Sequence, residues 1–305
     1  MELNPTRIKT ITEFHKLRGL PAPEHPLISV VDYSDIKRPP IAGEANWVLD
    51  FYHISIKRGL NAKLRYGQQE YDFDEGIMFF ISPNQVFRIE VEPNVVIKKS
   101  GWMLLIHPDF LWNTSLAKHI RQYDFFGYAA NEALFLSKKE EIIINGIIAN
   151  IRQEYLGNPD RFSQNILISH IETLLNYSER FYERQFMTRK ITNHQILDRL
   201  EALLHTCFSN GDLITKGLPT VQSIASELNI SSNYLSRLLK TLTGQSTRQF
   251  IHEKLIEKAK EMLSTTALSV SEIAYELGFD HPPSFTKLFK RKTSLSPSAF
   301  RQAFN

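Results

Sequence analysis

The stretch Ile224-Ala225-Ser226-Glu227-Leu228-Asn229-Ile230 decides the fold of the last third of this chain, because the pattern occurs twice. It aligns with Ile273-Ala274-Tyr275-Glu276-Leu277-Gly278-Phe279 at an offset of 49 residues. The segments that follow, residues 235–240 and 285–290, align at an offset of 50. Each copy predicts a short helix, a tight turn and a second helix, which is the order of a helix-turn-helix unit.

The residue types in the two copies fit this interpretation. Ala225 and Ala274 are small at the positions where two crossing helices would touch. Asn229 and Gly278 stand at the turn, where a left-handed backbone is needed and these two residue types adopt it most easily. A plain helical bundle with a duplicated hairpin is the alternative, but two copies in register favour a pair of helix-turn-helix units.

Apolar periodicity predicts that the whole region after residue 190 is helical. We expect helices over residues 194–207, 221–228, 232–242, 247–263, 270–277, 283–292 and 297–304. The helix between the two copies, 247–263, would be about 25 Å long. Two second helices joined in this way could reach successive major grooves on one face of DNA, which lie about 34 Å apart.

The net charge becomes informative only when it is resolved along the chain. The 305 residues are 42% hydrophobic and 23% charged, as in a packed protein of about two domains, and the formal charge is only +3. Residues 1–190 hold 23 basic and 23 acidic side chains, which leaves 13 basic and 10 acidic ones for residues 191–305. All of the excess positive charge therefore lies in the last third.

Within that third, the basic residues gather in and just after the second helix of each copy. They are Arg237, Lys240 and Arg248 in the first copy and Lys287, Lys290, Arg291, Lys292 and Arg301 in the second. Acidic residues lie in the other helices, among them Glu227, Glu257, Glu261, Glu272 and Glu276. This separation is the electrostatic footprint of a phosphate-binding surface and predicts double-stranded DNA as the partner.

The first part of the chain has a different character. Between residues 26 and 106, β-branched and aromatic runs at 47–56, 76–81, 85–91 and 95–97 are separated by Pro, Gly and Asn, which predicts a small antiparallel barrel or sandwich. Residues 138–155 and 166–181 change to the helical period. These two helices either cover a face of the barrel or pair with a second copy of themselves.

The repeated segments resemble the AraC family of bacterial transcription regulators. The matching stretches are residues 224–244 and 273–301, with Gly278-Phe279, Phe285, Phe289-Lys290, Ser296-Pro297 and Phe300-Arg301 at the family spacing. The resemblance implies an α+β fold: an N-terminal cupin-like antiparallel β-barrel with following helices, and a C-terminal all-α domain with two helix-turn-helix units. The corresponding domains are 1–137 for effector binding, 138–190 for dimerisation and linkage, and 191–305 for DNA binding.

The resemblance also implies which side chains meet DNA. Candidates for base contacts are Asn233, Ser236, Arg237, Ser284, Thr286 and Lys287, and candidates for phosphate contacts are Ser231, Lys240, Arg248, Lys290 and Arg291. Arg237 could donate two hydrogen bonds to guanine. The second copy departs from the family, with Pro282-Pro283 where polar side chains are usual and Ser294 where glycine is common. We therefore expect it to read fewer bases than the first copy.

An effector pocket is implied for the barrel. Its candidate lining residues are Trp47, Phe51, His53, Arg65, Tyr71, Met78, Phe80 and Trp102, for each of which ordinary core packing is the alternative. His25, His53 and His107 are isolated from one another, and there is no His-x-His pair, so neither a metal nor another cofactor is expected. Cys207 lies in an apolar helical stretch without a neighbouring basic residue, which favours a structural role over a reactive thiol.

These observations predict a sequence-specific DNA-binding transcription regulator whose first domain senses a small molecule, dimerises, or does both. We expect a cytoplasmic homodimer that contacts RNA polymerase, with no membrane segment, because no run of about 18 apolar residues occurs. The alternatives are a regulator without an effector, a cupin enzyme fused to a DNA-binding module and a DNA-repair methyltransferase fusion. The missing metal ligands and the setting of Cys207 disfavour the last two, so no enzyme activity is expected.

Overall fold

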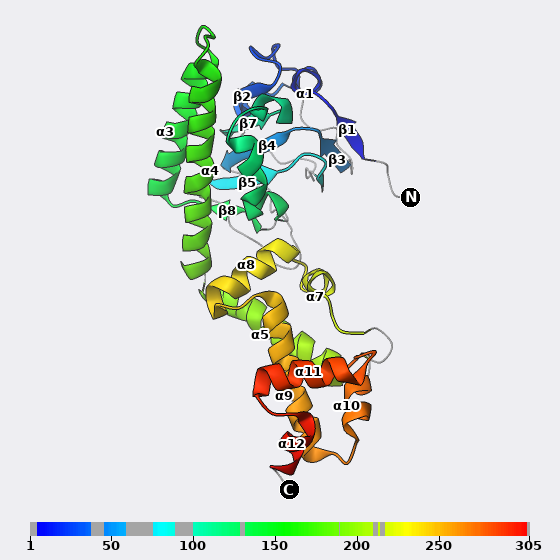
Figure 1. Ribbon diagram of the computed structural model, residues 1–305. Helices are drawn as coiled ribbons and strands as arrows, with labels where there is room; N and C mark the ends of the chain where they lie inside the picture. The colour runs from blue at the N-terminus through cyan, green and yellow to red at the C-terminus, as the bar shows by residue number, and fades with distance from the viewer. Residues whose placement is uncertain are drawn as a thin grey trace, which may run out of the picture. The chain divides into compact units, whose positions relative to one another are not determined.

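The computed structural model combines β-sheets in its first part with helices in its second part (Figure 1). It describes residues 5–37, 46–58, 76–88, 100–128, 132–188, 190–209, 213 and 217–303. The chain divides into two compact units, Met1–Gln185 and Phe186–Asn305. The α+β class is thereby confirmed.

Two sheets form the first unit. The larger has the order β2 (Ile28–Asp32), β7 (Ser100–Ile106), β4 (Tyr52–Arg58), β5 (Ile77–Ile81) and β8 (Leu134–Phe135), and every neighbouring pair is antiparallel. The smaller has the order β1 (Thr6–Ile8), β3 (Asn46–Leu49) and β6 (Val86–Arg88). Its β1–β3 pair is parallel, and the two sheets do not close into a barrel over the described residues.

The strand predictions are partly confirmed. The run 47–56 is not one strand but two, because the chain leaves the small sheet after Leu49 and enters the large sheet at Tyr52. β5 follows the run 76–81 closely, and β6 occupies the described part of 85–91. The run 95–97 lies outside the described residues. β2 and β7 were not among the predicted runs. β7 nevertheless lies inside the larger sheet, where it pairs with β2 on one side and β4 on the other.

One face of the five-stranded sheet packs against two long helices, α3 (Lys138–Tyr155) and α4 (Ser163–Thr188). Trp102 donates a hydrogen bond from Nε1 to Oδ1 of Asn145 at 3.0 Å. Arg152 on α3 binds both carboxylate oxygens of Asp32, at 2.7 and 3.0 Å. α3 begins and ends as predicted, and α4 extends beyond the expected 166–181 at both ends.

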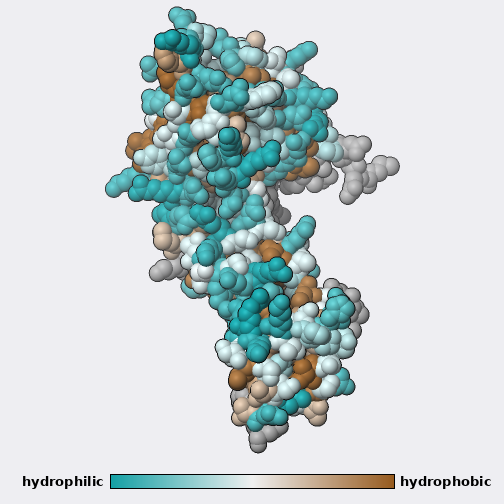
Figure 2. All heavy atoms as spheres, viewed as in Figure 1, coloured by the Kyte–Doolittle hydropathy of each residue, from teal (hydrophilic) through white to brown (hydrophobic). Residues whose placement is uncertain are grey.

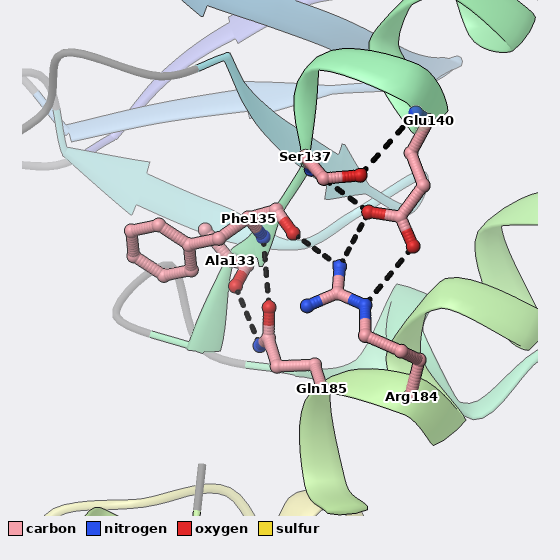
Figure 3. A network of polar contacts seen from close by, with 6 residues as sticks. All are labelled: Ala133, Phe135, Ser137, Glu140, Arg184 and Gln185. Carbon is pink, nitrogen blue, oxygen red and sulfur yellow. Dashed lines mark hydrogen bonds and ion pairs between the residues drawn. The ribbon is translucent and has the colours of Figure 1, made fainter. Parts of the chain in front are cut away.

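A polar network fixes the end of α4 to the start of α3 and to β8 (Figure 3). Ser137 and Glu140 form a capping box that begins α3. The guanidinium of Arg184 binds both carboxylate oxygens of Glu140, at 3.0 and 2.7 Å, and the carbonyl of Phe135 at 2.7 Å. Gln185 accepts a hydrogen bond from the backbone N–H of Phe135 at 2.8 Å. Arg184 therefore stabilises the first unit.

Shorter helices complete the first unit. They are α1 (Ile11–Arg18), α2 (Leu116–His119) and the 3-10 segments η1 (Tyr33–Asp35), η2 (Pro108–Leu111), η3 (Ile120–Gln122) and η4 (Asp124–Gly127). α1 was not predicted; Thr10 caps its start, and Gly19 ends it in a left-handed conformation. Its buried residues Ile11 and Phe14 join a core between the two sheets that also includes Trp47 and Phe51.

The second unit is helical throughout its described residues. Its helices are α5 (Lys190–Ser209), α7 (Val221–Glu227), α8 (Ser232–Thr243), α9 (Thr247–Thr265), α10 (Val270–Glu276), α11 (Pro282–Thr293) and α12 (Pro297–Gln302). Each lies where the periodicity predicted a helix. One apolar core runs through the unit, from Leu204 through Leu235 and Leu255 to Phe285, and Cys207 packs at its edge. No helix among the described residues is long and apolar enough to cross a membrane.

Candidate nucleic-acid interface

The two helix-turn-helix units have the same turn. Asn229 has φ = 56° and Gly278 has φ = 78°, so the left-handed conformation expected at both positions is confirmed. The N–H of Ile230 donates to the carbonyl of Ala225 at 3.0 Å, and that of Phe279 donates to Ala274 at 3.0 Å. Ala225 and Ala274 are 1% and 0% exposed, as close helix crossing requires.

In the first helix-turn-helix unit, the candidate base-contact residues share one face of α8. Asn233, Ser236, Arg237 and Lys240 follow one another at helical spacing. The side chain of Asn233 is exposed, whereas those of Ser236 and Arg237 are half-buried. The hydroxyl of Ser236 accepts a hydrogen bond from Thr247 Oγ1 at 3.3 Å, so α9 holds part of this surface in place.

Two candidate phosphate contacts of the first unit also serve the helix itself. Ser231 is the N-cap of α8, and its hydroxyl accepts a hydrogen bond from the N–H of Tyr234 at 3.1 Å. Lys240 is exposed and donates from Nζ to the carbonyl of Gly244 at 2.9 Å, at the end of the same helix. A phosphate that binds Lys240 therefore competes with this carbonyl.

The second helix-turn-helix unit presents a more uniformly cationic face. Ser284, Lys287, Lys290 and Arg291 are exposed on α11, and Thr286 is half-buried. Within the described part of the chain, Lys287, Lys290 and Arg291 form no ion pair. Such side chains remain available for phosphate, where Arg and Lys supply the dominant, salt-dependent part of DNA affinity.

The start of α11 differs from that of α8. His281 is the N-cap, but its side chain makes no capping hydrogen bond, and Pro282 and Pro283 occupy the first two helical positions. Proline suits this place because it has no N–H that would lack a partner there. The side chains of Pro282 and Pro283 are hydrocarbon rings, so they offer no donor for a base.

The two helix-turn-helix units meet at the first half of α9. Glu253 accepts a hydrogen bond from Gln245 Nε2 at 2.6 Å and pairs with Nζ of Lys292 on α11 at 3.0 Å. Hydrogen bonds from Lys292 and Gln245 lower the pKa of Glu253. One carboxylate thus joins the turn after α8 to the end of α11.

His252, the neighbour of Glu253, lies among cations from both units. Burial lowers its pKa, and the charges of Arg248, Arg291 and Lys292 lower it further. Two candidate phosphate contacts, Arg248 of the first copy and Arg291 of the second, therefore both act on the charge of His252. Sequence reasoning missed His252; its only signal was the spacing of four residues from Arg248, which puts both on one face of α9.

Not every basic residue counted in the sequence reaches this surface. Arg301 donates from Nε to the carbonyl of Leu263 at 3.1 Å and so supports the end of α9. Lys254 is bound by Glu201 and Glu257, at 3.1 and 3.3 Å. Arg248, Lys287, Lys290 and Arg291 are exposed and, in the part of the chain that the structure describes, have no carboxylate bound to them in this way.

Known proteins show the same domain. Residues 224–303 match a family model described as a helix-turn-helix domain. The raffinose operon transcriptional regulatory protein RafR of Pediococcus pentosaceus is 28% identical over 160 residues, or 52% of this chain and 55% of RafR. Residues 224–303 form an AraC-type helix-turn-helix domain.

Further known proteins are similar to part of this chain. The uncharacterized HTH-type transcriptional regulator YfiF of Bacillus subtilis is 32% identical over 142 residues, or 47% of this chain and 42% of YfiF. The solved C-terminal domain of AraT, a response regulator from Geobacillus stearothermophilus, is 33% identical with a TM-score of 0.31, covering 35% of this chain and 84% of that one. The chain spans about half the length of the curated relatives it matches.

In the unit that precedes the AraC-type domain, the candidate pocket residues separate into two groups. Trp47, Phe51 and His53 are buried between the two sheets or beside them. Met78, Phe80 and Trp102 face the opposite side of the five-stranded sheet, since Trp102 binds Asn145 on α3, and Phe80 packs on Phe125 at 4.4 Å. They therefore do not share one pocket with His53. Arg65 and Tyr71 lie outside the described residues.

The layer between the sheets contains several buried polar atoms without a hydrogen-bond partner in the described part of the chain. They are Arg18 Nε, Trp47 Nε1, both ring nitrogens of His53, and Ser55 Oγ. Burial, assisted by the charges of Lys57 and Arg18, lowers the pKa of His53 to about 3, so its ring is neutral. An unsatisfied buried polar group costs about 1–3 kcal/mol. No group of three or more His, Cys, Asp or Glu side chains able to hold a metal occurs among the described residues.

Proposed function

We propose that this chain is a transcription regulator that binds double-stranded DNA through α8 and α11. The observation that carries the proposal is the pair of equivalent helix-turn-helix units joined by α9, with the cations Lys287, Lys290 and Arg291 exposed on the second unit. The match of residues 224–303 to a helix-turn-helix family model supports it.

The length of α9 fits two adjacent major grooves. Its 19 residues make a rod of about 28 Å, and the widths of the helices joined to it extend the reach toward the roughly 34 Å between successive grooves. In this proposal Asn233, Ser236 and Arg237 read bases, and Ser284, Thr286 and Lys287 add fewer base contacts. Ser231, Lys240, Arg248, Lys290 and Arg291 bind phosphates.

The test begins with selection of binding sites from a random duplex library, followed by anisotropy titrations at several salt concentrations. With several phosphate contacts, the affinity should fall steeply with salt, with a slope of about 0.9 per contact. The triple variant K287A/K290A/R291A should lose most affinity, and the double variant K138A/K139A, which removes exposed charge from α3, should not. A binding constant independent of salt would contradict the proposal.

We also propose that the compact unit Met1–Gln185 is the regulatory part of the chain and forms the homodimer. As the resemblance implies, it would have a cupin-like barrel and contact RNA polymerase. Exposed isoleucines on α3 and α4 support dimerisation. Ile142 on α3 is 71% exposed, and its neighbour Ile143 and Ile166 on α4 are exposed as well. Figure 2 shows small hydrophobic patches within a mostly hydrophilic surface over α3 and α4. Burying such side chains favours association.

Light scattering of the full chain tests the dimer. Ile142→Glu should shift the mass toward the monomer, because a buried charge opposes association. Trp112→Glu, at a side chain that is 72% exposed elsewhere in the first unit, is the matched control. Equal masses for Ile142→Glu and the unchanged protein would show that this face does not carry the dimer.

A further inference from the structure

The inner face of the five-stranded sheet is unusually polar for a buried layer. The strand register puts His53, Ser55 and Lys57 on one side of β4, with Leu105 and Met103 of β7 beside them. Trp47 of β3 belongs to the same core cluster as Leu105 and Met103. Side chains from both sheets therefore face one layer.

Two cations line this layer. The guanidinium carbon of Arg18 lies 5.5 Å from the ring centre of Phe14 and 5.1 Å from that of Trp47, and Arg18 is only 7% exposed. Nζ of Lys57 lies 5.6 Å from the ring centre of Tyr33 and 5.2 Å from that of Phe79. In the described ranges neither cation has a carboxylate partner. A buried cation is ordinarily paired with an anion.

The buried polar atoms of the layer are mainly donors. Arg18 and Trp47 each offer an N–H with no acceptor among the described residues, and neutral His53 offers one donor and one acceptor. Ser55 adds a hydroxyl. The chemistry that satisfies this set is a carboxylate at the two N–H groups, attached to a skeleton with a hydroxyl or carbonyl for His53 and Ser55.

We propose that the layer between the two sheets binds a small organic carboxylate, with the carboxylate at Arg18 and Trp47 and a polar group of the ligand at His53 and Ser55. The inference rests on the proposed regulatory role of the unit Met1–Gln185 and names the chemical class of its effector. Arg18 and Trp47 come from α1 and the smaller sheet, and His53 and Ser55 come from the larger sheet. A ligand held by both pairs stabilises the state in which the N-terminal segment is packed on the larger sheet, and only such differential binding can regulate.

The experiment measures thermal unfolding of the full chain with acetate, lactate, succinate, gluconate and glucuronate. Each acid is compared with a neutral counterpart: acetamide, lactamide, succinamide, glucitol and glucose. We expect at least one acid, and not its counterpart, to raise the unfolding midpoint by several degrees at saturation, roughly as mass action dictates. No shift with any acid, or equal shifts with the neutral compounds, overturns the proposal.

Variants locate the site. Arg18→Met keeps contact with Phe14 and Trp47 but removes the buried charge, so its ligand-free midpoint should not fall while its response to the acid is lost. Trp47→Phe, which deletes only the indole N–H, should weaken binding by about ten-fold and serves if Arg18→Met does not fold. Arg161→Met removes an exposed arginine that lies over Phe162 and should respond as the unchanged protein does. An unchanged response in both site variants overturns the assignment.

DNA binding separates the two proposals. Salt-dependent DNA binding without any carboxylate response would overturn the ligand and leave the regulator standing. A carboxylate response that depends on Arg18, in a chain that binds no DNA, would overturn the DNA-binding regulator and leave the ligand site standing.

Discussion

The two helix-turn-helix units have the same backbone, but different residues make it possible. In the first unit the left-handed turn is Asn229 and the left-handed end of α8 is Gly244; in the second unit the turn is Gly278 and the end of α11 is Ser294. Each unit thus has one glycine and one residue with a side chain, in opposite places. The comparison shows that helix packing, rather than glycine at a given site, determines these conformations.

The surfaces of the two units differ more than their backbones do. α8 begins with a serine cap and presents an amide, a hydroxyl and one guanidinium close to α9. α11 begins with two prolines and presents three exposed cations, Lys287, Lys290 and Arg291. Amide and guanidinium groups can read base edges with two hydrogen bonds, whereas lysine binds phosphate mainly as a charge. In the proposed mode of DNA binding, this difference predicts that the first helix-turn-helix unit reads sequence and that the second mainly binds the DNA backbone.

The largest expected effect comes from exchanging one candidate base-contact residue in each helix-turn-helix unit, Arg237 in the first and Lys287 in the second. Arg237→Ala should lose about 1–3 kcal/mol of discrimination at one base pair, because a bidentate contact to guanine is removed. Lys287→Ala should weaken binding to all sequences alike and reduce the salt slope by about 0.9. Competition titrations with selected and single-substituted duplexes measure both. If Lys287→Ala relaxed base preference as strongly as Arg237→Ala, the division between the units would be wrong.

The helices could be predicted from the sequence because their signals are local. α3, α8 and α9 each combine a serine cap with apolar spacing, and the repeat set the two turns in register. The strands were harder, since the unbroken apolar run 47–56 gives no sign that the chain changes sheets after Leu49. The burial of Arg18 and the roles of Lys240 and Arg301 within the helical domain depend on long-range packing or on the local hydrogen-bond geometry, which residue type alone does not reveal.

The second expected effect concerns the turns. Gly278→Asn makes the second unit resemble the first, but a Cβ at this position would lie 3.0 Å from the carbonyl oxygen of Leu213 and 3.1 Å from its Cβ. We therefore expect a loss of about 1–2 kcal/mol in the free energy of unfolding, measured with urea. Asn229→Gly, the reciprocal change, should cost less than about 1 kcal/mol, since only chain entropy is affected. Equal losses would mean that the two turns have equivalent surroundings.

The helix ends allow a smaller and opposite test. Ser294 has φ = 63°, a left-handed conformation that a residue with a Cβ adopts at a cost, so Ser294→Gly should raise the free energy of unfolding by about 0.5–1 kcal/mol. Gly244→Ser should lower it by a similar amount, although a Cβ at Gly244 would meet no atom within 4 Å among the described neighbours. Urea unfolding of both variants and of the double exchange measures the effect. A stabilising Gly244→Ser would show that φ is not the determinant.

The smallest expected effect lies where the units meet, at His252. Its pKa in the folded protein is below the ordinary 6.5, first because of burial and then because of Arg248, Arg291 and Lys292. The unfolded chain therefore binds more protons than the folded one, so the contribution of His252 to stability is complete above about pH 6.5 and declines as the pH falls below it. DNA phosphates at Arg248 and Arg291 would offset those charges and raise the pKa again.

It follows that DNA binding takes up protons at His252, and that the affinity rises modestly, by a few-fold at most for a half-buried group, as the pH is lowered through the range below 6.5. Anisotropy titrations over that range, at constant salt, should show the rise in the unchanged protein and a smaller one in His252→Gln. His281, an exposed histidine at the start of α11, provides the control: His281→Gln should keep the full dependence. A pH dependence that follows His281 instead would place the shared phosphate site on the second unit alone, and cations from the first unit would then have no part in it.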